Sequence, residues 1–149
     1  MESLHPMFVH FPIVLLIAAF LIETAALLFR KPEWSRISFW HLLFGALAAL
    51  AAVCTGRLAM GIAKHSYQIY PVMEWHERIG YGVAALALTA VVLRFKSRDA
   101  ASVRYRLAAW ILLAVACGAM AFGAHLGGRL VYEFGVGGSY GRSAGIMVQ

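Results

Sequence analysis

Residues 6–29 read PMFVHFPIVLLIAAFLIETAALLF, an apolar run without lysine or arginine. An α-helix rises 1.5 Å per residue, so roughly 20 residues cross the ~30 Å hydrocarbon layer of a bilayer. This stretch is longer than that minimum. It therefore predicts a membrane-spanning helix from residue 6 to residue 29.

Three further apolar stretches of similar length follow, at residues 37–60, 72–95 and 105–128. The segments between the four stretches contain basic residues or proline, which interrupt apolar helices; they read RKPEWSR (30–36), GIAKHSYQIYP (61–71) and RFKSRDAASVRYR (94–106). The 149-residue chain is 62% hydrophobic and only 13% charged, which is outside the range of water-soluble domains. We expect an all-α protein with a four-helix transmembrane domain over residues 1–130 and a glycine-rich periplasmic tail over residues 131–149.

Short connections between consecutive spans predict an up-down-up-down bundle with both termini on one side of the membrane. Lysine and arginine concentrate in cytoplasmic loops. The side away from the termini has only two acidic residues against eight basic ones, which are Arg30, Lys31, Arg36, Arg94, Lys96, Arg98, Arg104 and Arg106. The terminal side is nearly balanced. We therefore expect both termini on the periplasmic side, and the chain to be a multi-pass protein of the bacterial inner membrane.

The net charge of +6 does not indicate a nucleic-acid partner, because the basic residues lie in short clusters between apolar runs, without an RNA-binding aromatic motif. Cys54 and Cys117 lie in two different spans and form neither a CxxC nor a CxxCH motif. The cysteines therefore predict no disulfide framework, zinc knuckle or covalent haem attachment.

Three histidines lie about one helical turn inside the same end of three spans: His10, His76 and His125. Arg57 lies at the corresponding depth in the remaining span. Polar residues inside membrane spans usually face the bundle interior and are functional candidates. We interpret these four as one polar layer near the periplasmic face. His5, by contrast, is expected at the water interface where the first helix begins.

A b-type haem fits this layer with the fewest assumptions, because two histidines on facing helices can ligate its iron without covalent attachment. His10 and His76 are the first-ranked axial pair, since the first and third helices are diagonal in a simple bundle. His125 either replaces one of them or serves a second site. Arg57 and Arg78 are placed to bind the haem propionates.

Other interpretations stay open. A copper or zinc ion could be held by His10, His76 and His125, with Glu77, Met73 or Met120 as additional ligands. A quinone could accept a hydrogen bond from one of the histidines. The protein could also be a structural membrane subunit without cofactor, with interfacial histidines.

Three local features carry expectations of their own. Pro12 lies inside the first span and should free the carbonyl of Phe8, loosening the turns around His10. Glu23 and His41 lie at similar depths near the cytoplasmic end and could bond to each other. The GxxxG pair Gly123 and Gly127 is typical of close helix packing.

Two stretches, LHPMFVHFPIVLL (4–16) and AHLGGRLVYEFGVGG (124–138), resemble the hallmarks of a bacterial transmembrane family, domain of unknown function 2231. The resemblance covers essentially the whole chain and departs at Ala124, where glycine is expected, and at Gly138, where valine is frequent. The matching positions are His5, Pro6, His10, Phe11, Pro12, His125, Gly127, Gly128, Leu130, Val131, Tyr132, Gly135, Val136 and Gly137.

The resemblance implies four spans and a redox setting, because family members occur joined to or near Rieske and c-type cytochrome modules. It thus favours haem over a bare metal. We expect a membrane-bound haem b electron-transfer protein that is a subunit or partner of a larger redox complex and exchanges electrons with a periplasmic carrier. A quinone partner and a homo-oligomer are left open. The spans offer no substrate pocket with its own acid, base or nucleophile, so an electron-transfer subunit is favoured over a stand-alone enzyme.

Overall fold

The computed structural model describes residues 5–60, 67, 69–97 and 103–136, and the regular elements of this part are all helices. Their bounds are α1 (His5–Phe8), α2 (His10–Leu28), α3 (Pro32–Met60), α4 (Tyr70–Lys96) and α5 (Val103–Tyr132). Four helical stretches are long and apolar enough to cross a membrane, with α1 and α2 together forming the first. The predicted all-α fold with four spans is confirmed.

Two helix boundaries differ from the expected spans by more than two residues. The helix α3 begins at Pro32, five residues before the expected start, because proline is favoured in the first turn, where its missing N–H is not needed. The helix α5 continues through Gly127 and Gly128 to Tyr132. The first two residues of the expected tail are therefore helical, and residues 137–149 lie outside the described part of the chain.

The first span is interrupted at Val9, which separates α1 from α2. Pro12 lies two residues into α2 and cannot donate a hydrogen bond to the carbonyl of Phe8, four residues earlier. The interruption lies where Pro12 was expected to loosen the helix. Val9 nevertheless keeps helical dihedral angles, with φ −66° and ψ −24°, so α1 and α2 together form one span that carries His5 in its first turn.

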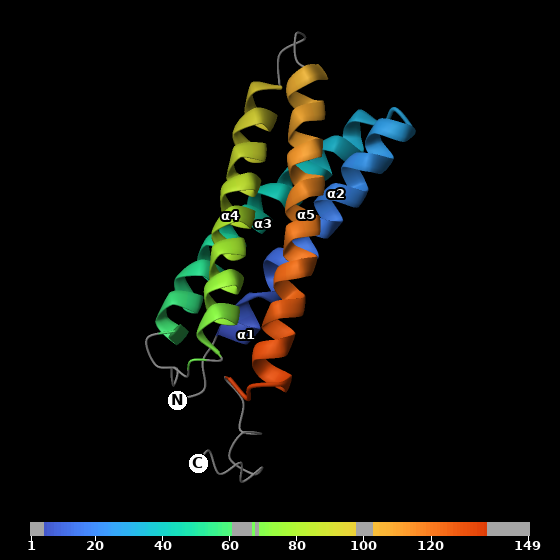
Figure 1. The fold of residues 1–149 in the computed structure, drawn as a ribbon. Helices are drawn as coiled ribbons and strands as arrows, with labels where there is room; N and C mark the ends of the chain where they lie inside the picture. The colour runs from blue at the N-terminus through green and yellow to red at the C-terminus, as the bar shows by residue number, and fades with distance from the viewer. Residues whose placement is uncertain (1–4, 61–66, 68, 98–102, 137–149) are drawn as a thin grey trace.

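The four long helices form two hairpins, α2 with α3 and α4 with α5, which cross each other and diverge at one end (Figure 1). We call that end the hairpin end; it consists of the end of α2, the start of α3, the end of α4 and the start of α5. The other end, which holds α1, the end of α3, the start of α4 and the end of α5, is the terminal end.

The core between the hairpins is built mainly from small side chains. Leu16 and Leu113 are its largest fully buried members, and alanines such as Ala19, Ala46 and Ala87 are fully excluded from the surface. Apolar side chains gain little by leaving lipid tails for one another, so close packing of small residues is what holds membrane helices together. The large apolar side chains are mostly exposed on the outside of the bundle, as lipid contact requires.

Candidate functional site: a histidine-lined cavity

A cavity of about 530 Å³ lies at the terminal end of the bundle. Its walls come from α1 and from all four long helices, and they are predominantly apolar. Its size falls within the range of cofactor and small-molecule sites, which is roughly 300–1,000 Å³. The few polar side chains that line it therefore decide what it can bind.

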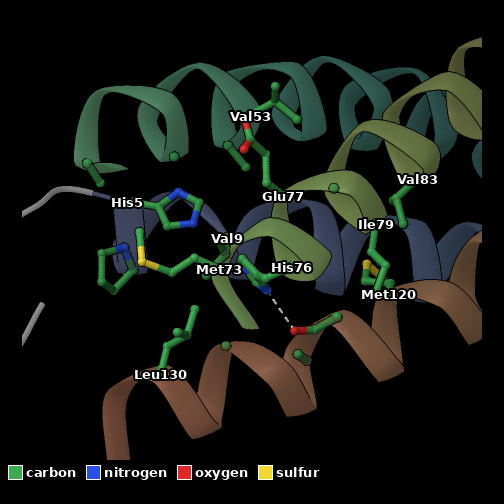
Figure 2. A pocket seen from close by; sticks show the side chains of 18 of the residues that line it. His5, Val9, Val53, Met73, His76, Glu77, Ile79, Val83, Met120 and Leu130 are labelled. Carbon is green, nitrogen blue, oxygen red and sulfur yellow. Dashed lines mark hydrogen bonds between the residues drawn. The ribbon is translucent and has the colours of Figure 1, made fainter. Parts of the chain in front are cut away.

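His76 projects from α4 toward α5 and is half-buried (Figure 2). Its Nδ1 lies 2.9 Å from the carbonyl oxygen of Gly123. Its ring also packs on Gly127, where a Cβ would lie 3.1 Å from Cε1 of His76. The two glycines of the GxxxG pair therefore form a surface on α5 that receives the imidazole of His76.

His5 reaches the cavity from α1 and contacts α3. Its Nδ1 lies 3.2 Å from Oγ1 of Thr55, and its Cε1 would lie 3.0 Å from a Cβ at Gly56. The Thr55 hydroxyl donates its own hydrogen to the carbonyl oxygens of Ala51 and Ala52, both at 3.0 Å. Since that hydrogen is already used, Thr55 can only accept from His5, which assigns the proton to Nδ1 of His5.

The His5 and His76 rings lie edge to face, with centroids 6.1 Å apart and planes at 81°. Both rings use Nδ1 for a hydrogen bond to the protein, so both carry the free lone pair on Nε2. This is the usual arrangement of metal-ligating histidines.

The other two histidines of the predicted layer are placed differently. His10 lines the cavity but is largely exposed, and its Nδ1 bonds to the carbonyl oxygen of Pro6 at 2.7 Å. His125 is exposed and is not among the lining residues. It lies two residues from both Gly123 and Gly127, on the other side of α5. The structure thus brings His5 to His76, and does not bring His125 to them.

Of the two arginines expected at the propionates, one reaches the cavity. Arg57 lines the cavity wall and donates to Oε1 of Glu77 at 2.7 Å, an oxygen that Tyr81 also binds at 2.9 Å. Arg78 pairs with Glu74 at 2.6 Å on the exposed face of α4 and is not a lining residue. The structure therefore leaves Arg57 as the cation at this site.

The comparison with protein families gave a match over most of the chain. The model of the family described as "Predicted membrane protein (DUF2231)" matches residues 1–139. The chain belongs to this family. The comparisons with curated proteins and with solved structures gave no match.

The two stretches that carried the family resemblance meet at the cavity. His5 and Pro6 come from the first stretch and Gly127 and Leu130 from the second, and all four are lining residues. Residues of the two stretches thus line one cavity.

Within the described ranges, no three His, Cys, Asp or Glu side chains are grouped so that they could hold a metal ion. The set of His10, His76 and His125 considered for copper or zinc is therefore not assembled. Met73, one turn before His76 on α4, lines the cavity and is 4% exposed. Its thioether is a soft ligand near the two imidazoles, and Met60 and Met120 (Figure 2) also line the cavity.

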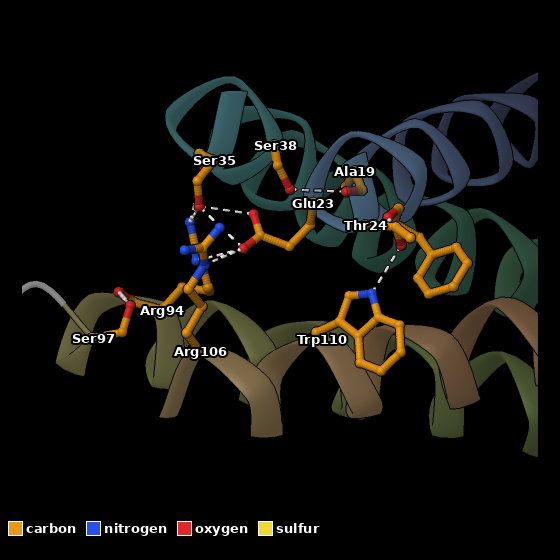
Figure 3. A network of polar contacts seen from close by, with 10 residues as sticks. Ala19, Glu23, Thr24, Ser35, Ser38, Arg94, Ser97, Arg106 and Trp110 are labelled. Carbon is orange, nitrogen blue, oxygen red and sulfur yellow. Dashed lines mark hydrogen bonds and ion pairs between the residues drawn. The ribbon is translucent and has the colours of Figure 1, made fainter. Parts of the chain in front are cut away.

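A second polar cluster lies at the hairpin end (Figure 3). Glu23 on α2 is 2% exposed, and its carboxylate accepts from Ser35 Oγ at 2.9 and 3.0 Å, from Arg94 at 3.1 Å and from Arg106 at 2.6 Å. We call these four residues the Glu23 cluster. It joins all four long helices.

The prediction that Glu23 could bond to His41 is wrong. His41 instead bonds through Nδ1 to the carbonyl oxygen of Ile37, in its own helix. Arg94 and Arg106, which sequence reasoning counted as loop charges, are the true partners of Glu23. The sequence contained one signal for this pairing. Glu23 lies inside an apolar span, and a buried carboxylate needs a cationic partner, which the basic residues at the ends of neighbouring helices can supply.

Proposed function

We propose that the protein holds a b-type haem in the terminal-end cavity, with His5 and His76 as axial ligands, and serves in electron transfer. The observation that carries the proposal is the pair of neighbouring imidazoles, whose Nδ1 atoms bind protein oxygens, so that the lone pair of each neutral ring is on Nε2. Two ligands from different helices are sufficient for haem iron, whereas bare copper or zinc sites normally need three or more. The pair replaces His10 with His5 in the predicted ligand set.

Bound haem would supply a one-electron couple at its iron. The protein's own residues have separate tasks around it. Thr55 and the Gly123 carbonyl orient the two imidazoles and raise their basicity as ligands. Apolar lining residues such as Ile79 and Val83 exclude water. Arg57, at the wall, is the group that would meet a propionate.

We further propose that the helices run up-down-up-down through a bacterial inner membrane, with the terminal end on the periplasmic side. The unequal distribution of basic residues supports this orientation. It places the cavity near the periplasmic face, where a periplasmic carrier or another redox subunit can exchange electrons with it. The protein then acts as an electron-transfer subunit or partner of a larger complex.

One observation favours a second candidate function, Cu(I) binding. Cu(I) prefers soft thioether and imidazole ligands, and Met73 accompanies His5 and His76 in the same cavity. In that case the protein would handle copper rather than carry electrons on haem. Elemental analysis of the purified protein separates the two, since haem brings iron and this alternative brings copper.

The test of the haem proposal is a set of four alanine variants purified from membranes under haem-replete conditions. His5→Ala and His76→Ala should lose haem, measured as haem per polypeptide. His10→Ala and His125→Ala are the matched controls and should retain it. Haem retention in both His5→Ala and His76→Ala would refute this ligand pair, and loss in His125→Ala alone would assign the site to that residue.

A further inference from the structure

The Glu23 cluster contains more positive than negative charge. Two guanidinium groups, Arg94 and Arg106, share the single carboxylate of Glu23. The side chains of Glu23 and Arg94 are 3% and 10% exposed, so water compensates little of this excess. The cluster therefore retains about one uncompensated positive charge.

One donor in the cluster is also unused. Nη2 of Arg106 is buried and has no hydrogen-bond partner in the described part of the chain. The Arg106 side chain as a whole remains 27% exposed, so the guanidinium is at the edge of the cluster. Buried polar atoms normally have partners, which indicates that a group outside the described residues completes this one.

The depth of the cluster indicates where that group comes from. The helices α4 and α5 have 27 and 30 residues, or about 40 and 45 Å, against a hydrocarbon layer of about 30 Å. Arg94 lies two residues from the end of α4, and Arg106 three residues from the start of α5. Residues this close to the helix ends fall outside a hydrocarbon layer centred on the helices, at the depth expected for lipid phosphates.

The two ends of the bundle differ in how their cations are compensated. At the terminal end each described arginine has its own carboxylate, in the pairs Arg57–Glu77, Arg78–Glu74 and Arg129–Glu133. At the hairpin end, by contrast, several exposed cations have no ion pair with any residue that the structure describes. They are Arg30, Lys31, Arg36, Lys96 and Arg104. The unmatched charge is thus concentrated on both arms of the end where the hairpins diverge (Figure 1).

We propose that Arg94 and Arg106 form a binding site for the phosphate of an anionic phospholipid at the hairpin end. The lipid phosphate accepts from Arg106 and offsets the excess charge, while the exposed cations around it favour an anionic over a zwitterionic headgroup. The bound lipid lies between the two hairpins and links them. This inference does not depend on what the cavity at the other end binds.

The test measures lipid retention by the full-length protein in neutral detergent. Native mass spectrometry compares dioleoyl phosphatidylglycerol, dioleoyl phosphatidylcholine and inorganic phosphate, and thermal unfolding is recorded with each. The wild type should retain phosphatidylglycerol selectively and unfold at a higher temperature with it. Arg129→Gln, at the terminal end, is the control and should behave like the wild type.

Two variants should change the affinity in opposite directions. Arg106→Gln should weaken phosphatidylglycerol binding about fivefold, the effect of removing one cation near an anionic surface. Glu23→Gln removes the competing carboxylate and should strengthen binding. A purely structural cluster predicts lower unfolding temperatures for both variants and no dependence on the lipid.

Three outcomes would overturn the proposal. One is equal retention of the two lipids by the wild type. Another is phosphatidylglycerol binding that is unchanged or weaker in Glu23→Gln. This outcome can be measured even if Arg106→Gln does not fold. The third is equal stabilisation by inorganic phosphate, which would assign the site to a free anion instead of a lipid.

Discussion

His76 on α4 and Gly127 on α5 are in direct contact, with only 3.1 Å between Cε1 of the imidazole and the position a Cβ would take at residue 127. The neighbouring Gly128 has nothing within 4 Å of the same position. Two adjacent glycines in one helix therefore have different tasks. Only Gly127 provides space for a candidate ligand.

This difference predicts opposite effects for two alanine substitutions. Gly128→Ala should stabilise the protein slightly, by up to about 1 kcal/mol, because alanine is the better helix former. Gly127→Ala should displace the His76 ring by a few tenths of an ångström and lower haem occupancy. Thermal unfolding and haem content of the two purified variants check this; equal haem content in both would contradict the positioning role of Gly127.

Thr55 should determine the tautomer of His5. Thr55→Val removes the acceptor for Nδ1–H, so His5 should populate both tautomers and haem affinity should fall by about tenfold or more, as loss of an orienting partner does at metal sites. Thr55→Ser keeps the hydroxyl and should restore both properties. Nitrogen-15 NMR of labelled histidine reports the tautomer without haem; a single unchanged tautomer in Thr55→Val would show that Thr55 has no such role.

Glu23→Ala should be one of the most destabilising substitutions in the chain. It leaves Arg94 and Arg106 without their carboxylate, and breaking a buried ion pair from one side costs about 3–5 kcal/mol. Glu33→Ala is the comparison, since Glu33 is exposed at the same end, and its loss should change stability by less than about 0.5 kcal/mol. Unfolding temperatures in neutral detergent measure both; a Glu23→Ala protein as stable as Glu33→Ala would refute the assigned importance of the cluster.

Gly45 should be indispensable for the α2–α3 hairpin. A Cβ there would lie 2.7 Å from Cδ2 and 3.0 Å from Cγ of Leu16, which is fully buried, so the Leu16 side chain would have to shift within the core. Gly45→Ala should therefore cost about 1–3 kcal/mol, as overpacking does. Gly118→Ala, with open space around its Cβ position, should not destabilise. The prediction fails if thermal unfolding gives both variants the same stability.

Length and hydropathy were sufficient to predict the four helices, because a membrane span needs only a run of apolar residues. The depth of polar residues along each helix was also predictable: His10 and His76 do both line the cavity. The rotation of each helix about its own axis was not predictable from the sequence. His125 lies at the predicted depth, yet Gly123 and Gly127 are the residues of α5 that face His76.

The two remaining differences arise from contacts between distant residues. His5 was expected at the water interface, but the first turn of the first span places it against Thr55, 50 positions away. Arg94 and Arg106 were read as topology signals, although they bind Glu23 from 71 and 83 positions away. Sequence periodicity holds no information on such pairings, because they depend on how the hairpins cross.

The most direct test of the haem proposal is the absorbance spectrum of the purified wild-type protein, recorded oxidised and after reduction with dithionite. Two axial imidazoles make haem iron six-coordinate and low-spin, so we predict a sharp α band on reduction. His5→Ala or His76→Ala should remove it. Wild-type protein extracted from haem-replete membranes that shows no such band would contradict the central claim.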